Sequence, residues 1–324
     1  MTAKNRQWTT KQDGLDNLEL GETAIPEPKD GEVLVKIKAV SLNYRDTEVC
    51  QGEYTHHSSL DNGQPLVPCS DMAGEIVASK SPRWQKTGAR VLSIFNQTHL
   101  TVLAQYRVFP DYALVPIPEY LSDEEACTLP IAAVTAWTSI NGFRPLGQYL
   151  DVTTQTKDEK KPPPVLLAQG TGGVSVAALQ IAHAAGLATI VTSSSDDKLD
   201  RARKELSADT GINYRTHWEW HDFACVAFGG TIACIGYLSG KDDDEGDGGL
   251  NRLNVNVLAL RRNVTLKGIL NGPRDRFEEM LGFYEKKGIR PVVDKVFKFE
   301  EAKEAFKYLA EGAHFGKVVI KVAD

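Results

Sequence analysis

A glycine-rich turn between an apolar strand and an apolar helix is the feature that most constrains the fold of this chain. Residues 165–186 read VLLAQGTGGVSVAALQIAHAAG. The turn itself consists of Gly170, Thr171, Gly172, Gly173 and Val174. Glycines let such a turn tighten and approach a diphosphate, whose charge the free N–H groups at the helix start can hold. The pattern predicts a dinucleotide site, and the alternative is an ordinary strand-to-helix turn that is rich in glycine.

The segments that follow alternate between strand and helix patterns. Strands are predicted at residues 165–168, 188–192, 212–214, 231–235 and 264–269, and helices at residues 174–185, 197–206 and 277–286. This alternation predicts a doubly wound parallel sheet of the α/β class, with right-handed crossovers. An amphipathic helix at 299–310 and a strand at 318–322 come last, and we expect that strand to return to the first domain.

The first third of the chain has the period of β-structure. Residues 31–41 alternate apolar and polar, and shorter strands are predicted at residues 72–78, 90–95, 104–109 and 113–117. Pro/Gly turns between them favour a compact β-barrel domain. Ser122 and Glu125 then form a helix-start signature before an apolar helix at 129–140.

The length of 324 residues exceeds what a single core usually fills. We therefore predict a β-barrel domain over residues 1–136, a nucleotide-binding domain over 137–287 and a return to the first domain over 288–324. The Pro-rich stretch at 153–164 is interpreted as an exposed loop.

Charge and cysteine content exclude several classes of protein. A net charge of −6 argues against nucleic acid and anionic membranes as partners. The chain has no apolar run long enough to cross a bilayer and no secretion signal, so we expect it in the cytoplasm. Its five cysteines are scattered, without a CxxC pair, which argues against disulfides and a structural zinc site.

The end of the second parallel strand bears on which dinucleotide is bound. An NAD-binding fold places a carboxylate there for the ribose 2′-hydroxyl, whereas this chain has Ser193, Ser194 and Ser195. Small hydroxyls leave room for a 2′-phosphate, to which Lys198 and Tyr214 could add a cation and a phenol. The pattern favours NADP, although Asp196 or Asp197 could still serve NAD.

Six motifs together resemble the medium-chain dehydrogenase/reductase superfamily, and within it the zinc-less quinone-reductase and enoyl-reductase branch. They are GEVLVKIKAVSLNYRD (31–46), LVPCSDMAGEIV (66–77), LPIAAVTAWTSI (129–140), QGTGGVS (169–175), FGGTIACIGY (228–237) and GKVVIKV (316–322). The resemblance implies a GroES-like β-barrel catalytic domain with a Rossmann domain inserted before its last segment. It also implies a homodimer.

The same resemblance predicts that no metal is bound. Zinc-dependent relatives carry a Cys ligand and a His ligand where this chain reads Asn43-Tyr-Arg-Asp46 and Ser70-Asp-Met-Ala-Gly74. Catalytic zinc needs about three protein ligands and an open position. The pair His56 and His57 is isolated and fits a loop better than a ligand set.

Without a metal, hydrogen-bond donors must stabilise charge that develops on the substrate oxygen. The resemblance places Tyr44 and Asn43 facing the nicotinamide, so both are candidate catalytic residues. Alternatively, Tyr44 only packs at the barrel rim and Asn43 only holds a turn.

Further residues are implied to contact the cofactor. Thr135 resembles the cofactor-contacting threonine of the superfamily, unless its hydroxyl only bonds to its own helix. Gly236 and Tyr237 would lie at the tail of the cofactor site, and Leu270 and Lys317 at its nicotinamide end.

The chain departs from the superfamily in two shortened stretches. Residues 98–102 replace a longer segment that normally shapes a substrate loop. Residues 215–227 allow only one crossover of about a dozen residues where relatives have a helix, a strand and a helix. The Rossmann sheet therefore loses a strand beside the nicotinamide, and either closes up to five strands or belongs to a shortened version of a longer product.

Three functions remain open from the sequence. The first is an NADPH-dependent reductase of enones, quinones or aldehydes. The second is a zinc-less alcohol dehydrogenase-like enzyme working in the oxidative direction. The third is a non-catalytic nucleotide-binding protein, because the sheet is short.

Overall fold

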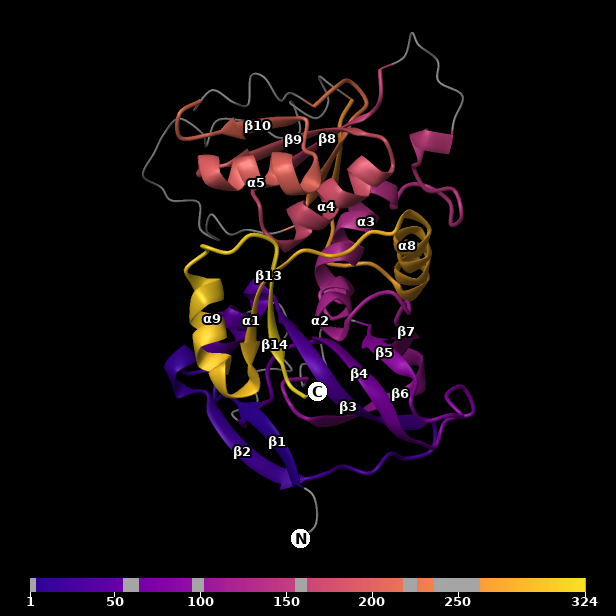
Figure 1. Cartoon of the computed structure of the whole chain (residues 1–324), viewed down its shortest axis with the longest axis vertical. Helices are drawn as coiled ribbons and strands as arrows, with labels where there is room; N and C mark the ends of the chain where they lie inside the picture. Colours follow the sequence, from indigo (N-terminus) through magenta and orange to yellow (C-terminus); the bar gives the residue numbers. More distant parts are fainter. Residues whose placement is uncertain are drawn as a thin grey trace.

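The computed structural model describes residues 4–54, 64–94, 102–154, 162–217, 226–235 and 263–323. In Figure 1 the N-terminal strands and the C-terminal strand lie together in the lower half, and the parallel strands β8, β9 and β10 lie in the upper half. The chain thus forms the two-part α/β architecture that its sequence predicts.

The lower half is built on one mixed sheet. Its described strands are ordered β13-β14-β3-β4-β5-β7, with β6 also paired to β3. Their bounds are β3 (Glu32–Leu42), β4 (Asp71–Ser79), β5 (Arg90–Ser93), β6 (Tyr106–Pro110), β7 (Leu114–Pro116), β13 (Val293–Lys298) and β14 (Lys317–Lys321). Alternate residues of β3, among them Val33, Val35 and Ile37, are fully buried in the core of this barrel.

The last strand returns to the first domain, as predicted. β14 pairs antiparallel with β3, with Val318 opposite Leu42. The sequence did not indicate β13, which pairs parallel with β14. Helix α9 (Ala302–Ala310) connects the two strands and buries Phe306 and Leu309.

Three further elements carry little sequence signal. β1 (Lys4–Thr9) pairs antiparallel with β2 (Glu19–Ala24), whose residues are all exposed. Helix α1 (Tyr44–Gln51) begins after Asn43, where Asn43 and Asp46 form a capping box, and ends before Gly52. Because β2 buries nothing, it lacks the alternation by which strands are recognised.

Helices at the junction of the two halves follow the prediction. Helix α2 (Asp123–Ala126) is capped by Ser122, whose hydroxyl accepts a hydrogen bond from the N–H of Glu125. A π-helical segment, η4 (Leu129–Ala133), continues into α3 (Val134–Asn141). The predicted domain boundary after residue 136 therefore falls inside one helix.

Helix α3 is held by aromatic packing against α8 (Arg274–Lys287). The rings of Trp137 and Phe283 lie 5.1 Å apart, and the indole N–H of Trp137 donates to Glu279 at 2.8 Å. Burying two such aromatic side chains is worth several kcal/mol. This contact fixes α3, the helix that carries Thr135, against α8. The chain that follows α8 leads back to the lower half.

The parallel strands of the upper half form two separate sheets among the described residues. β10 (Thr210–Asn213), β9 (Ala188–Ser193) and β8 (Val165–Gln169) make the first, covered by α4 (Gly173–Ala184) and α5 (Asp196–Leu206). β11 (Thr231–Cys234) and β12 (Thr265–Gly268) make the second. Closure into one five-stranded sheet is therefore not seen in the described ranges.

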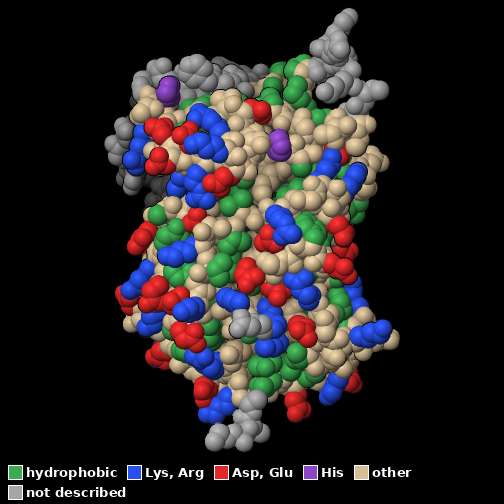
Figure 2. All heavy atoms as spheres, in the orientation of Figure 1, with side chains coloured by type: hydrophobic (Ala, Val, Ile, Leu, Met, Phe, Trp, Pro, Cys, Tyr) green, Lys and Arg blue, Asp and Glu red, His purple; other side chains and the backbone are tan. Residues whose placement is uncertain are grey.

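The visible surface carries both signs of charge. Figure 2 shows Lys and Arg side chains interspersed with Asp and Glu over the lower half and over α5. Among the described residues, no helix combines the length and apolarity needed to cross a membrane.

Candidate active site

The glycine-rich turn has the predicted strand–turn–helix geometry. Gly170 has φ +83°, a conformation that favours glycine, and its N–H donates to the carbonyl of Thr192 at 3.0 Å. Gly172 is extended and caps α4, which begins at Gly173. The carbonyl of Gly172 already accepts from Val176, so the N–H groups between them have no partner within the helix. Such groups form an anion site.

The last strand of the lower half is attached to this turn. The N–H of Gly316 donates to the carbonyl of Thr171 at 3.0 Å, and Gly316 bridges Gly172 in parallel register. A Cβ atom on Gly173 would lie 2.5 Å from Cδ of Lys317. The aliphatic part of Lys317 therefore covers the first turn of α4, which brings this predicted residue to the site.

The ammonium group of Lys317 reaches across to the first domain. It donates to the carbonyl of Leu42 and to Oδ1 of Asn43, both at 2.6 Å. Only 7% of Lys317 is exposed. Burial lowers the pKa of Lys317, and the nearby carboxylates of Asp71 and Asp46 oppose that shift.

Asn43 has both ends of its amide engaged. Its Nδ2 donates to Oδ2 of Asp71 at 3.0 Å, while its Oδ1 accepts from Lys317. Its backbone N–H donates to Asp46 at 2.8 Å. These contacts hold Asn43 within the protein, and its role as a donor to substrate stays a prediction.

Asp71 is the site residue that the sequence analysis missed. It is fully buried at the start of β4, and its Oδ2 also accepts from the N–H of Ile131 at 3.3 Å. Burial raises its pKa to about 7, although Lys317 and the Asn43 amide act in the opposite direction. The sequence signal that could have indicated Asp71 is a carboxylate at the start of an apolar strand, because a charge is rarely buried without a partner.

Tyr44 is presented differently from its neighbour Asn43. It is the first residue of α1, and 46% of it is exposed. Next to it, Arg45 donates to the hydroxyl of Ser70 at 3.3 Å and lies 4.8 Å from the ring centre of Tyr54. Tyr44 is therefore open to solvent, and the role of its phenol towards a substrate stays a prediction.

Among the residues that the structure describes, no three His, Cys, Asp or Glu side chains are arranged to hold a metal ion. His56 and His57 lie outside those residues. A metal-free site therefore stays a prediction.

Thr135 lies against the segment that was predicted to line the nicotinamide end. Its hydroxyl donates to Oδ1 of Asn271 at 3.5 Å. A Cβ atom on Gly272 would come within 2.4 Å of Val134 and Thr138, so this segment packs tightly on α3. Leu270 is 59% exposed beside it. The structure thus joins Thr135 to Asn271, the residue that follows Leu270.

Of the residues predicted to select NADP, the structure brings Ser193 and Tyr214 together at the end of β9. The carbonyl of Ser193 accepts from the N–H of Tyr214 at 3.1 Å, and Ser194 is half-buried beside it. Lys198 donates to the carbonyl of Gly312 at 2.9 Å, and burial lowers the pKa of Lys198 while Tyr214 raises it. Gly236 and Tyr237 lie outside the described residues.

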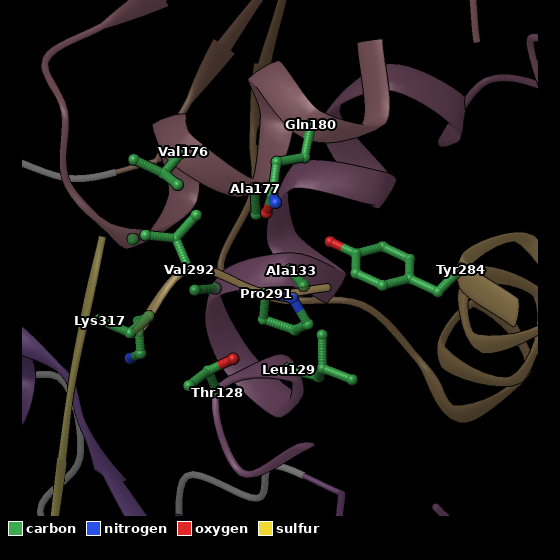
Figure 3. A pocket seen from close by; sticks show the side chains of 12 residues that line it. Thr128, Leu129, Ala133, Val176, Ala177, Gln180, Tyr284, Pro291, Val292 and Lys317 are labelled. Atoms are coloured by element: carbon green, nitrogen blue, oxygen red, sulfur yellow. The ribbon is translucent and has the colours of Figure 1, made fainter. Parts of the chain in front are cut away.

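A small pocket lies where the two halves meet, below the start of α4. Figure 3 shows Lys317 entering it from β14 and Tyr284 from α8, with Pro291 and Val292 between them. Thr128, Leu129, Ala132 and Gly173 complete this side of the wall. The stem of Lys317 is therefore part of the packed junction.

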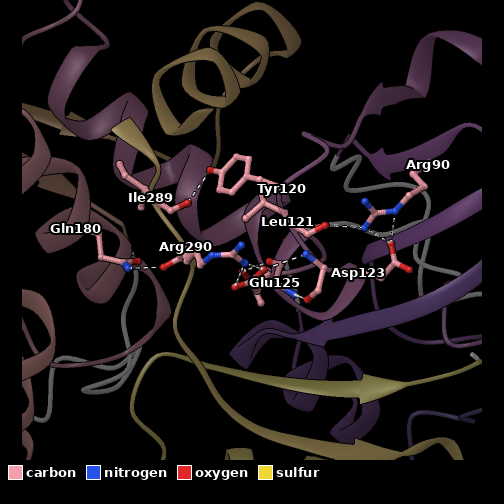
Figure 4. Close-up of polar contacts among 10 residues, drawn as sticks. Arg90, Tyr120, Leu121, Asp123, Glu125, Gln180, Ile289 and Arg290 are labelled. Carbon is pink, nitrogen blue, oxygen red and sulfur yellow. Dashed lines mark hydrogen bonds and ion pairs between the residues drawn. The ribbon is translucent and has the colours of Figure 1, made fainter. Parts of the chain in front are cut away.

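The chain crosses between the halves at residues 289–292, and it is held there from both sides (Figure 4). Gln180 of α4 donates to the carbonyl of Arg290, and Tyr120 donates to the carbonyl of Ile289, both at 2.7 Å. The guanidinium of Arg290 pairs with Glu125 at 2.8 Å. These bonds fix the crossing next to the pocket.

Two families of known proteins match separate parts of the chain. Residues 29–119 match the alcohol dehydrogenase GroES-like domain family, and residues 214–320 match the zinc-binding dehydrogenase family. A zinc-type alcohol dehydrogenase-like protein of Schizosaccharomyces pombe is 36% identical over 355 aligned positions, which cover 95% of this chain and 96% of that protein. The chain belongs to the medium-chain dehydrogenase/reductase superfamily.

Other members of the medium-chain dehydrogenase/reductase superfamily are similar over most of this chain. A chloroplastic NADPH-dependent alkenal/one oxidoreductase of Arabidopsis thaliana is 27% identical and covers 95% of this chain and 76% of its own. The quinone oxidoreductase of Thermus thermophilus, solved also with NADPH, is 26% identical, with a TM-score of 0.69 over 98% of this chain and 100% of that one. The alignment with the S. pombe protein is longer than the 324 residues of this chain, so that relative has stretches that this one lacks.

Proposed function

We propose that this oxidoreductase uses NADP(H) to transfer hydride to a small enone, quinone or aldehyde without a metal ion. The attachment of β14 to the glycine-rich turn carries the proposal, because it holds Lys317, and through Lys317 the amide of Asn43, next to the start of α4. A Cβ atom on Gly170 or Gly172 would meet no atom within 4 Å, so the turn is open on the side where a diphosphate would lie. The residues present therefore fit a dinucleotide.

The preference for the 2′-phosphate is supported at the end of β9. Asp196, one of the two carboxylates that could instead bind a 2′-hydroxyl, accepts a hydrogen bond from the side chain of Asn213 at 2.8 Å. Lys198 follows in the first turn of α5, where its ammonium donates to the carbonyl of Gly312 at 2.9 Å. A cation and hydroxyl groups favour a phosphate over a neutral ribose. The NADPH named for the alkenal/one and quinone relatives agrees with this preference.

The chain's own contribution to the reaction is donation of a hydrogen bond. A bound reduced nicotinamide supplies the hydride. The phenol of Tyr44 then donates to the substrate oxygen as negative charge develops on it, which lowers the barrier without a Lewis acid. A conjugated enone that takes hydride at its β-carbon can collect its proton from water, so it depends less on Tyr44.

Two other functions remain in competition. A zinc-less alcohol dehydrogenase-like enzyme would use the same residues in the oxidative direction, and the name of the S. pombe relative favours it. A nucleotide-binding protein without catalysis is favoured by the separation of β8 from β11 among the described strands. Both would still bind a dinucleotide at the turn.

Cofactor binding and turnover separate these functions. The purified chain is titrated with NADPH and with NADH by nucleotide fluorescence, and NADPH oxidation is then measured with quinones, enones and aldehydes, with and without a chelator. We expect tighter binding of NADPH and turnover that the chelator leaves unchanged. Binding without turnover of any substrate, in either direction, would favour the non-catalytic function. No binding at ~1 mM nucleotide would end the proposal.

We also propose that the chain forms a homodimer, as the resemblance to the superfamily implies. Leu266 of β12 is 42% exposed, which leaves apolar surface on this two-stranded sheet for a partner to cover. Light scattering coupled to size-exclusion chromatography measures the mass, and a monomer would contradict the proposal.

A further inference from the structure

We propose that Asp71 is a positioning residue that couples proton uptake to cofactor binding, acting through Asn43 and Lys317 on the glycine-rich turn. The inference rests on the proposed function, because it needs a dinucleotide at that turn. Asp71 itself contacts neither the turn nor the exposed Tyr44 in any hydrogen bond of the described residues.

A continuous series of hydrogen bonds leads from Asp71 to the turn. Oδ2 of Asp71 accepts from the amide of Asn43 at 3.0 Å, and the other end of that amide accepts from the ammonium of Lys317 at 2.6 Å. The stem of Lys317 lies over Gly173, the first residue of α4. The donors and acceptors fix the orientation of the Asn43 amide, because a carboxylate only accepts and an ammonium only donates.

Two acids, Asp71 and Asp46, share this cluster with two cations, Lys317 and Arg45, so the formal charges balance when all four groups are ionised. Asp46 and Arg45 face Asp71 from α1, Lys317 from β14, and the thiols of Cys69 and Cys127 from the start of β4 and the end of α2. Within the described residues, Oδ1 of Asp71 is buried and has no hydrogen-bond partner. A proton on this carboxyl group removes a buried charge that has one oxygen without a hydrogen-bond partner, which agrees with a pKa raised by burial to about 7.

A diphosphate at the turn shifts the protonation equilibrium of Asp71 in one direction. Its negative charge attracts the ammonium of Lys317, the nearest cation on β14. The ammonium then compensates the charge of the Asp71 carboxylate less than it does in the free protein. Protonated Asp71 is then favoured, so the bound protein has a higher pKa at this group than the free protein. Linkage requires that binding takes up a proton and that affinity falls as the pH rises through about 7. His314, just before β14, also faces Lys317 and could add a shift of the same sign.

The test measures dissociation constants of NADH and NADPH by fluorescence between about pH 6 and about pH 8.5. We expect the dissociation constant of both nucleotides to rise at least threefold over this range in the unmodified chain. Using NADH removes the titration of the 2′-phosphate, whose pKa is near 6. D71N, which imitates the protonated acid, should bind with an affinity that is flat with pH, whereas H314N should keep the pH dependence.

A second measurement does without D71N, in case that variant does not fold. Calorimetric titration of NADH at pH 7, in two buffers of different ionisation enthalpy, gives the number of protons taken up on binding. We expect a fractional uptake that K317M, which lacks the ammonium, abolishes. Binding with no proton uptake and no pH dependence would overturn this inference alone. Absence of nucleotide binding at every pH would overturn the proposed function, and this inference with it.

Discussion

The N–H of Gly316 donates to the carbonyl of Thr171 over 3.0 Å, which joins the last strand of the barrel to the dinucleotide turn of the other half. Lys317 follows Gly316 directly, so its stem is placed over Gly173 by backbone pairing. A change in the turn is therefore transmitted to Lys317 and, through it, to Asn43.

Replacing Gly173 with alanine tests this placement. The new Cβ atom would lie 2.5 Å from Cδ of Lys317 and 3.3 Å from Cβ of Ala132, so the buried lysine must move. We expect NADPH affinity to fall about tenfold or more, since overpacking of a filled site costs about 1–3 kcal/mol. Fluorescence titration of NADPH measures the change.

Gly282 provides the matched control within α8. A Cβ atom there meets nothing within 4 Å, so G282A should leave NADPH affinity unchanged and stabilise the helix by up to about 1 kcal/mol. Equal affinities of G173A and the unmodified chain would show that Lys317 is not held against the turn.

The local part of this site could be predicted from the sequence, and the part that depends on strand register could not. The turn before α4 was predicted because its glycines and the flanking apolar runs are adjacent in the chain. The cluster of Asp71, Asn43 and Lys317 forms only because β4 and β14 both pair with β3. No local pattern shows that three residues so far apart will share one buried space.

The same distinction between local pattern and strand pairing explains which parts of the fold could be predicted. The predicted strands and helices of the upper half lie within a few residues of their observed bounds, because each has its own periodicity. The exposed strand β2 was missed, since it has no apolar face to be recognised. The separation of β8 from β11 was not predicted either, because a strand's pairing partner is a property of the whole sheet.

Lys198 is expected to determine the preference for NADPH. Replacing it with alanine removes the cation at the end of β9, so NADPH affinity should fall about tenfold while NADH affinity stays within about twofold. Parallel titration with both nucleotides measures the ratio. K204A removes an exposed lysine from the same helix and should leave the ratio unchanged. An equal loss of affinity for both nucleotides in K198A would show that Lys198 supports the fold of α5 and does not select between them.

Tyr44 is expected to act on the substrate and not on the cofactor. Y44F keeps the ring and removes the donor, so kcat for aldehydes should fall about 100-fold with NADPH affinity unchanged. The loss for enones should be smaller, because water can protonate their product. Steady-state kinetics with both substrate classes measures the difference, and Y112F, at an exposed tyrosine away from the site, is the control. A Y44F enzyme with full aldehyde activity would exclude this role.

Asp294 links α5 to the returning strand β13 and should make stability depend on pH. Its carboxylate accepts from the hydroxyl of Tyr308 at 2.7 Å and from Arg201 at 3.0 Å, and Arg201 also lies over the ring of Phe315. Burial raises its pKa, but these hydrogen bonds outweigh that effect and leave the pKa below its ordinary value. A lowered folded-state pKa contributes stability above the unfolded-state pKa of about 3.9, and that contribution is lost as the pH falls through the folded value.

D294N should therefore lower the free energy of unfolding by about 1–2 kcal/mol at neutral pH, a range that allows for the partly exposed Arg201. The difference from the unmodified chain should shrink as the pH falls below about 4, where the native carboxyl group also begins to be protonated. Urea unfolding followed by tryptophan fluorescence at several pH values measures it. D200N breaks only the exposed pair between Asp200 and Arg203 on α5, so it should cost less than about 0.5 kcal/mol at any pH. If D294N and D200N cost the same at neutral pH, Asp294 contributes no more to joining the two halves than an exposed ion pair does.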